Sequence, residues 1–289
     1  MDFEIKNEYL EVKFQEKGAE ITELKDKKGI QYIWTADKRY WARHAPVLFP
    51  IVGKLKDNRY FYNGSEYSMT QHGFARDYNF KVITHNKENI IFELCSNSET
   101  LKKYPFDFSL KIEYTLEKNR LTTKYTVESP EKIYFSIGAH PGFNCPLSEN
   151  EGFEDYFIEF GEKENFEFML LDHETGLFTG EIKKSAEKFG VLNLNHKLFE
   201  NDALVFTGMK SKEVTIKNKK EDKNIKVNFD GFPFLGIWTM TNDAPFICIE
   251  PWFGHADFKD SDNIFENKKG LIKLEKNEKF SCSFFFEIF

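Results

Sequence analysis

The chain has 289 residues, of which 40% are hydrophobic and 30% charged, and its net charge at pH 7 is −7. This composition is typical of a globular protein, and the negative charge argues against nucleic acid or an anionic membrane as the default partner. No stretch approaches the roughly 20 apolar residues of a membrane span, and the N-terminus has no apolar signal core, so we expect a cytoplasmic protein.

The first third of the chain shows the two-residue periodicity of half-buried strands. Leu10, Val12 and Phe14 alternate with charged residues, and Ile30 to Trp34 is a second expected strand. The apolar, proline-containing segment 41–54 fits no regular period and is expected to be a loop along a sheet or cleft. Asn63-Gly64, between aromatic runs, predicts a tight hairpin turn.

The middle of the chain gives the clearest alternation. Residues 108–116 place Phe, Leu, Ile, Tyr and Leu on one face, and residues 121–127 form their expected hairpin partner. That hairpin leads into the apolar run Ile133 to Ile137, and His140 follows directly after it. We therefore expect His140 just beyond a strand end.

The second half continues with short apolar segments separated by turn residues. Residues 179–190 are charged and ambiguous, and one or two helical turns are expected there, whereas 280–289 should pair into a sheet. Aromatic residues, at 17% with 32 Phe, favour strands throughout. We predict an all-β protein with antiparallel sheets forming one domain over residues 1–289.

The residues around His140 are unusually constrained. Pro141 and Pro146 fix their own φ, and Gly138 and Gly142 allow backbone approaches that a Cβ would forbid. A histidine held in this way is a candidate proton donor, because its charge changes near neutral pH. The other interpretation is a histidine that merely fills a turn.

Two further clusters contain polar side chains at expected strand ends. His72 follows the predicted hairpin, and Glu250 ends a very apolar run and precedes Pro251 and Trp252. A carboxylate in such surroundings is costly to bury unless it is paired or used. Aromatic rings beside a carboxylate suit the apolar and hydroxyl faces of a sugar. A second aromatic, Trp238, is expected to belong to the core.

Two histidines and a carboxylate allow two chemistries. One is a metal site, although the chain has neither an H-x-H nor an H-E-x-x-H motif. The other is metal-free general acid–base catalysis, in which a normal glutamate and a normal histidine would need no unusual pKa shift at neutral pH. The four cysteines are widely spaced and contain no C-x-x-C, so reduced, buried thiols are expected.

Five short segments, in this order, resemble the aldose 1-epimerase family, and more narrowly its LacX-like branch, which is related to hexose-6-phosphate epimerases: residues 49–54, 72–77, 138–143, 201–204 and 250–252. The resemblance implies a galactose mutarotase-like β-supersandwich whose open concave face binds a monosaccharide. It also implies that the reaction uses no metal and no organic cofactor.

The resemblance further implies roles for the clustered residues. His140 corresponds to the general acid that protonates the sugar ring oxygen, and Glu250 to the base that takes the proton from the C1 hydroxyl. His72 corresponds to a histidine that binds and orients the sugar. Asp202 corresponds to an acidic residue that binds sugar hydroxyls, and the neighbouring Asn201 is the alternative match.

The cations near these segments depart in part from the family pattern. Lys54 stands where this branch commonly has arginine, so the contact lacks a bidentate guanidinium, and Arg59 is an alternative source of that group. Arg76 is a further cation that could bind a sugar phosphate, or it could be a surface arginine paired with Asp77.

We therefore expect a cofactor-free aldose 1-epimerase acting on an aldohexose or its phosphate, as a monomer or weak homodimer without nucleic-acid or membrane partners. Two alternatives stay open. The same fold could bind carbohydrate as a sensor without turnover, or His72, His140 and Glu250 could ligate a metal in a β-sandwich enzyme.

Overall fold

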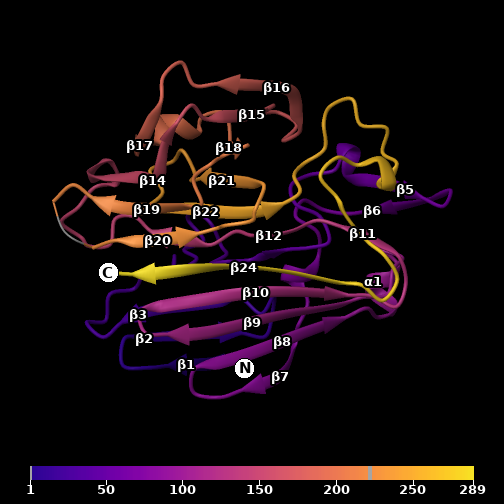
Figure 1. The fold of residues 1–289 in the computed structure, drawn as a ribbon, viewed down its shortest axis with the longest axis horizontal. Coiled ribbons are helices and arrows are strands. Elements are labelled where there is room, and N and C mark those ends of the chain that lie inside the picture. The colour runs from indigo at the N-terminus through magenta and orange to yellow at the C-terminus, as the bar shows by residue number, and fades with distance from the viewer. Residues whose placement is uncertain (1, 221–222) are drawn as a thin grey trace.

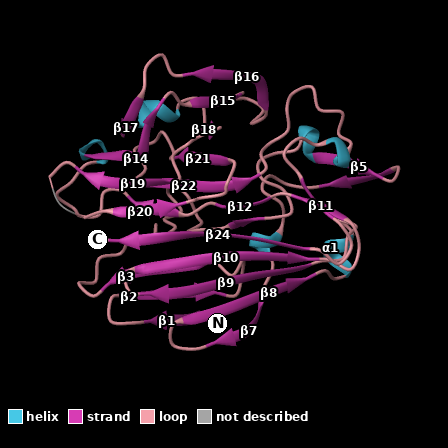
Figure 2. Ribbon diagram, viewed as in Figure 1, coloured by secondary structure: helices cyan, strands magenta, loops and turns pink. Residues whose placement is uncertain are grey.

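The computed structural model describes residues 2–220 and 223–289, and these form 24 strands, five single 3-10 turns and one short helix, α1 (Ser98–Leu101). Every pairing between these strands is antiparallel. Figure 2 shows how little of the chain is helical. In this part of the chain no helix has the length and apolar character needed to cross a membrane.

The larger of the two main sheets has nine strands in the order β17-β14-β19-β20-β24-β10-β9-β8-β7. In Figure 1 its long strands β24, β10, β9 and β8 lie one below another. The nine strands, in chain order, are β7 (Lys81–His85), β8 (Asn89–Cys95), β9 (Ser109–Glu117), β10 (Arg120–Glu128), β14 (Tyr156–Glu164), β17 (Phe189–Asn193), β19 (Glu213–Asn218), β20 (Ile225–Asn228) and β24 (Lys279–Ile288).

The second main sheet has eight strands in the order β16-β15-β18-β21-β22-β12-β4, with β13 also pairing to β22. These strands are β4 (Val47–Leu48), β12 (Ile137–Ala139), β13 (Gly142–Asn144), β15 (Glu167–Leu171), β16 (Phe178–Lys184), β18 (Leu204–Thr207), β21 (Phe234–Trp238) and β22 (Phe246–Phe253).

Three small sheets complete the fold. One has three strands and two have two strands each. They are formed by β1 (Asp2–Lys6), β2 (Leu10–Gln15) and β3 (Ile21–Asp26), by β5 (Arg59–Tyr62) and β6 (Ser65–Ser68), and by β11 (Ile133–Phe135) and β23 (Ile272–Leu274).

The main core lies between the sheets and follows from the alternation of apolar residues. Ile112 of β9 and Ile247 and Ile249 of β22 are fully buried in one continuous cluster. Phe14 of β2 joins the same cluster, with its ring 4.7 Å from that of Tyr114. Successive side chains of a strand point to opposite faces, so Cys248, which lies between Ile247 and Ile249, and Glu250 must face away from this core.

Strand β22 therefore presents a second set of side chains on the other face of its sheet. Cys248 belongs to a separate small cluster beside Trp34, and Trp252 to another beside Leu48 and Val52. Glu250 lies between them in the alternation and is buried. This outer face of the eight-stranded sheet carries the cavity described below.

The antiparallel all-β architecture is confirmed, and so is the hairpin at Asn63-Gly64, where both residues have positive φ (47° and 76°). His140 follows β12 immediately, as predicted. Strand β2 buries Leu10, Val12 and Phe14, which is the alternation that the sequence predicted.

Three expectations about strands were wrong. Residues 30–34 make only isolated bridges and no strand. The backbone N–H of Tyr32 donates to Leu24 and that of Trp34 to Gly142, so the segment bonds to two different neighbours and pairs continuously with neither. Residues 179–184 lie in β16 and 189–190 in β17, with a short connection between them, rather than in helical turns; β16 is an edge strand that faces solvent and tolerates its charged residues. Glu250 lies within β22, which continues to Phe253 because β21 and β12 pair with it there.

Two smaller expectations also need correction. Ser136 divides the run 133–137 into β11 and β12. Among the cysteines, Cys145 and Cys248 are buried as expected, whereas Cys95 is exposed.

Candidate active site

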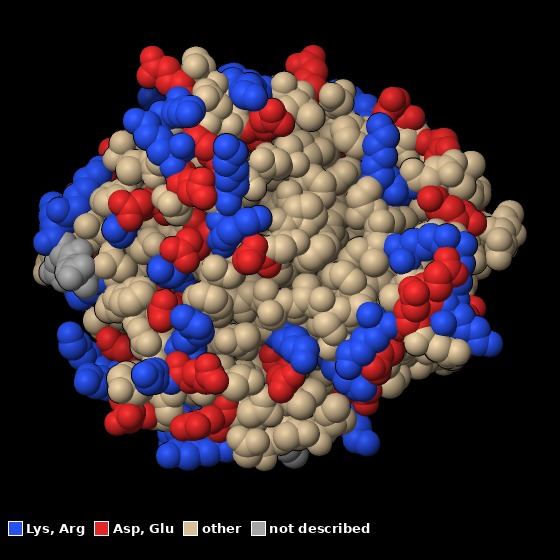
Figure 3. All heavy atoms as spheres, viewed as in Figure 1, with Lys and Arg blue, Asp and Glu red and all other residues tan. Residues whose placement is uncertain are grey.

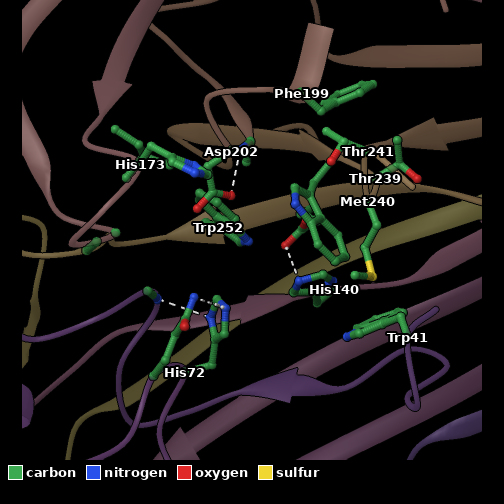
Figure 4. Close-up of a pocket in the computed structure, with 18 of the residues that line it drawn as sticks. Trp41, His72, His140, His173, Phe199, Asp202, Thr239, Met240, Thr241 and Trp252 are labelled. Carbon is green, nitrogen blue, oxygen red and sulfur yellow. Dashed lines mark hydrogen bonds and ion pairs between the residues drawn. The ribbon is translucent and has the colours of Figure 1, made fainter. Parts of the chain in front are cut away.

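A cavity of about 490 Å³ opens on the outer face of the eight-stranded sheet. This is within the usual size range of small-molecule sites. Its wall includes His72, Arg76, His140, Asp202 and Glu250, which come from four separate parts of the sequence. Figure 4 shows the labelled side chains converging on one space. The cavity is thus where the chain brings its predicted site residues together.

His140 is held by its backbone and by aromatic rings. Its N–H donates to the carbonyl of Pro46 at 3.1 Å. The imidazole stacks on Trp41, with ring centroids 4.7 Å apart and planes at 28°, and the edge of Trp238 lies 5.6 Å away. These contacts fix the orientation of the ring, so His140 presents Nε2 in a defined direction.

That direction is toward Glu250. Nε2 of His140 lies 3.3 Å from Oε2 of Glu250, and Figure 4 marks this contact. Both side chains are buried, and neither Oε2 of Glu250 nor Nδ1 of His140 has a hydrogen-bond partner within the described residues. Unsatisfied buried groups are rare in folded proteins and require an explanation. Here they leave two groups free to bind a ligand.

Burial sets the proton distribution of this pair. It lowers the pKa of His140 to about 3, with the charge of Arg76 acting in the same direction. It raises the pKa of Glu250 well above its usual value, and the charge of Asp202 adds to this rise. Both shifts favour a neutral His140 beside a protonated Glu250, because a buried site of low polarity disfavours the charged forms. The expectation that no pKa shift is involved was wrong, because both groups are buried.

His72 lies beside this pair as a neutral donor. The ring nitrogen Nδ1 accepts the N–H of Gly53 at 3.1 Å, so Nε2 carries the proton. Burial lowers the pKa of His72 well below its usual value, and the positive charges of His140 and Arg76 add to this. The rings of His72 and His140 are 5.5 Å apart. Nε2 of His72 also lies 3.3 Å from the side-chain amide of Gln71, which lines the cavity too, so a ligand there would meet both polar groups.

Trp252 lies flat against the sheet because its neighbours lack side chains. A Cβ on Gly236 of β21 would be 2.6 Å from the indole ring, and one on Gly138 of β12 would be 2.7 Å from it. Both glycines flank β22 in the sheet. The ring fills the space that two Cβ atoms would occupy and forms part of the cavity wall next to Glu250. Such a flat apolar surface can contact the C–H face of a sugar.

Asp202 projects from the turn before β18 with a positive φ of 77°. Its Oδ1 accepts the N–H of Ala203 at 2.7 Å, which fixes the carboxylate at the cavity wall. Asn201, the alternative match, is exposed and does not line the cavity. Between the two residues, the structure therefore places Asp202 at the site.

The cations are placed differently from one another. Arg76 lines the cavity and donates to the carbonyl of Gln71 at 2.6 Å, while its buried Nε has no partner among the described residues. Burial lowers its pKa to about 10, and the charge of Arg43 adds to this. Asp77, the suggested alternative partner of Arg76, bonds instead to Arg43 at 2.9 Å.

The other two cations do not reach the cavity wall. Lys54 does not line the cavity, although its side chain would be 3.6 Å from a Cβ on Gly176, which does. Arg59 is in the β5–β6 hairpin, 3.4 Å from Glu66 and 3.8 Å from Asp57. Arg76 is thus the cation in the wall among the three that the sequence suggested.

The sequence reasoning missed three parts of the wall. Trp41 lies in the loop predicted for 41–54, but nothing in that loop's sequence shows that it stacks on His140. His173 projects from the turn between β15 and β16, and Figure 4 shows it beside Asp202. Trp238 was expected in the core, whereas it packs against a small cluster and also lines the cavity.

One group of metal-ligating side chains exists among residues 2–220 and 223–289. It consists of His140, Cys248 and Glu250, whose ligand atoms lie within 4.8 Å of one another. His72 is not part of it, because neither of its ring nitrogens lies within that distance of the other ligand atoms. The metal alternative with His72 as a ligand therefore does not match the geometry.

On the face seen in Figure 3, Lys and Arg side chains are interspersed with Asp and Glu around uncharged areas. This face offers no continuous basic surface of the kind that binds nucleic acid.

Comparison with known proteins assigns this architecture to a family. Residues 1–284 match the model of the family described as aldose 1-epimerase, and the chain belongs to that family. Among curated proteins, the plasmid-encoded protein LacX of Lactococcus lactis subsp. lactis is 38% identical over 283 residues, covering 95% of each chain.

Two solved structures from lactobacilli have the same fold over their full length. A galactose mutarotase related enzyme from Lactobacillus acidophilus superposes with a TM-score of 0.96 at 34% identity, covering 100% of this chain and 97% of that one. A galactose mutarotase-like protein from Lactobacillus casei gives a TM-score of 0.93 at 29% identity, covering 100% of both chains. The fold is therefore the galactose mutarotase-like one, as the sequence indicated.

Proposed function

We propose that this protein is an aldose 1-epimerase that interconverts the α and β anomers of an aldohexose or its phosphate. Membership of the aldose 1-epimerase family supports a carbohydrate epimerase activity. The specific proposal, interconversion of anomers, rests on the His140–Glu250 pair, whose side chains are 3.3 Å apart in a cavity large enough for a small molecule. Mutarotation needs one acid and one base at two oxygens of the same carbon, and this pair offers both.

The proposed reaction needs no group besides these two side chains. Glu250 takes the proton from the C1 hydroxyl while His140 protonates the ring oxygen, and the C1–O5 bond breaks to give the aldehyde. Rotation about the C1–C2 bond presents the other face of the carbonyl. Ring closure returns the proton from Glu250 to the C1 oxygen and the ring proton to His140.

Burial of the pair favours the proton distribution that occurs while the sugar ring is open. The cycle begins with the proton on His140 and passes through the open-chain sugar with the proton on Glu250. Burial favours that second distribution, because it lowers the pKa of His140 and raises that of Glu250. A sugar bound with its hydroxyls near the pair supplies the polarity that the empty cavity lacks, which brings the two distributions closer in energy.

The surrounding side chains would position the sugar. Trp252 offers a flat face, His72 a hydrogen-bond donor and Asp202 a fixed acceptor. Arg76, whose buried Nε has no partner among residues 2–220 and 223–289, favours a substrate that carries a phosphate. Lys54 is proposed to contribute a positive charge near Gly176 of the wall.

The test is a substrate survey by polarimetry, starting from single anomers of aldohexoses and of their 6-phosphates. The proposal predicts that the protein accelerates the approach to anomeric equilibrium for at least one of them. Acceleration of none of these sugars above the buffer rate would refute it. Saturable binding without acceleration would instead select a carbohydrate-binding protein on the same fold.

A further inference from the structure

Cys248 has no part in the proposed reaction, yet it lies beside the pair that performs it. It precedes Glu250 by two residues in β22, so both side chains project from the same face of the sheet. The thiol is fully buried. The sulfur of Cys248, a ring nitrogen of His140 and a carboxylate oxygen of Glu250 all lie within 4.8 Å of one another.

We propose that His140, Cys248 and Glu250 form a binding site for a thiophilic divalent cation such as Zn²⁺, and that the bound cation inhibits the epimerase. The binding itself is independent of the enzyme's reaction. The inhibitory consequence rests on the proposed function of His140 and Glu250, because the cation occupies the atoms that would move the protons.

The distances suit a small tetrahedral ion. Zinc bonds of about 2.0–2.3 Å to nitrogen, oxygen and sulfur place ligand atoms roughly 3.3–3.7 Å apart in a tetrahedron. The His140–Glu250 contact of 3.3 Å is already at this separation. The thiol needs to approach the other two atoms by no more than about 1 Å, which a χ1 adjustment of a cysteine can supply.

The unsatisfied atoms of the pair point independently to a ligand. Oε2 of Glu250 and Nδ1 of His140 are both buried without hydrogen-bond partners within the described residues. With Nε2 as the ligand, as in the 3.3 Å contact, the ring proton is on Nδ1, and the lone pairs offered to the cation are those of Nε2 and of Oε2 of Glu250. Three protein ligands leave a fourth position on the cavity side, where water or a sugar hydroxyl can bind.

The charge balance favours the complex in a buried place. Binding releases two protons, one from the thiol of Cys248 and one that His140 and Glu250 share. The thiolate and the carboxylate then neutralise the two positive charges of the cation. A neutral complex avoids the cost of a net charge in a low-dielectric site. Mg²⁺ and Ca²⁺ prefer oxygen ligands only, so the site selects against them.

Two consequences follow for the sugar reaction. A cation on His140 and Glu250 removes the acid and the base together, so inhibition should be nearly complete at saturation. Because the ion lies at the cavity wall, sugar and cation should weaken each other's binding by the same factor. Mg²⁺ should have no effect on turnover.

The binding test uses Co²⁺ as a spectroscopic probe of the full-length protein, with Zn²⁺ stoichiometry from equilibrium dialysis. We expect one ion per chain and a sulfur-to-cobalt charge-transfer band. Cys248→Ala and Cys248→Ser should abolish the band and weaken binding by at least roughly 100-fold. Loss of a residue that only holds a ligand in place costs up to about that much, and loss of the ligand itself should cost no less. The matched control is Cys145→Ala, since Cys145 is equally buried but outside the cluster.

The inhibition test measures anomer exchange with and without Zn²⁺ on the sugar that the survey identifies. Zn²⁺ should suppress exchange at least tenfold in the native protein and in Cys145→Ala, and a chelator should restore it. Absence of a stoichiometric site, or native-like cobalt binding by Cys248→Ala, overturns the inference. A cysteine-dependent cobalt band in a protein that exchanges no anomers would uphold the metal site and refute the proposed function alone.

Discussion

Adding a single methyl group at Gly236 tests whether the flat placement of Trp252 forms the site. The new Cβ would lie 2.6 Å from the indole ring, whereas carbon atoms in contact are normally about 3.5–4.0 Å apart. The ring must therefore move by about 1 Å. Overpacking of this kind costs about 1–3 kcal/mol. At roughly 2–4 °C per kcal/mol for a chain of this class, Tm should fall by about 2–12 °C.

The functional effect of Gly236→Ala should exceed its effect on stability. Trp252 lies next to Glu250 in the wall, and a displacement of about 1 Å near a reacting pair can cost up to about 100-fold in rate. Calorimetry and the rate of anomer exchange measure the two effects. Gly190→Ala in β17 is the matched control, because its Cβ would meet Lys163 at an ordinary 3.5 Å. A Gly236→Ala protein with native Tm and native turnover would show that the ring position does not matter.

Three further predictions concern the charged groups of the wall. Glu250→Gln should abolish turnover yet raise the free energy of unfolding at pH 7 by about 1–2 kcal/mol. The reason is that the pKa of Glu250 is raised in the folded protein, so the native protein loses stability as the pH rises above the usual pKa of a glutamate. Urea titrations at pH 4 and pH 7 measure the gain in stability, which should be smaller at pH 4. The pKa of His140 is lowered to about 3 in the folded protein, so between roughly pH 6.5 and 3 the unfolded chain is protonated at this residue while the native protein is not. Native stability is therefore lost as the pH falls through that window. His140→Asn should flatten this part of the pH–stability curve relative to the native protein. Arg76→Met should raise the KM for an aldose phosphate by roughly 10–100-fold, which corresponds to the loss of a hydrogen bond to a charged group. The KM for the unphosphorylated sugar should change by no more than about twofold. Equal effects on both sugars in steady-state kinetics would argue against a phosphate contact.

The fold could be predicted because its determinants are local. The alternation around Leu10 to Phe14 and the Asn63-Gly64 turn each specify a strand or hairpin without reference to the rest of the chain. The edge strands β16 and β17 could not be predicted, since β16 is exposed and largely polar, and β17 is a short segment with no two-residue apolar period. What identified them is pairing with β15 and β14, which is a long-range property.

The candidate site was predictable in its residues but not in its geometry. The segments around His72, His140 and Glu250 stand out by composition, and all three side chains line the cavity. Their electrostatics depend on burial by distant segments, so the lowered pKa of His140 could not be foreseen. Nothing in the sequence indicated that His173 would line the cavity and Lys54 would not.

The central claim is that the His140–Glu250 pair transfers the protons of ring opening. Exchange NMR at anomeric equilibrium measures the interconversion rate directly, without a coupled enzyme. With the sugar that the survey identifies, native protein and the surface control His85→Gln should exchange anomers at the same rate. His140→Gln and Glu250→Gln should each fall to about 1% of that rate or less, as expected for loss of a general acid or base. Native exchange rates in either of these two variants would contradict the account.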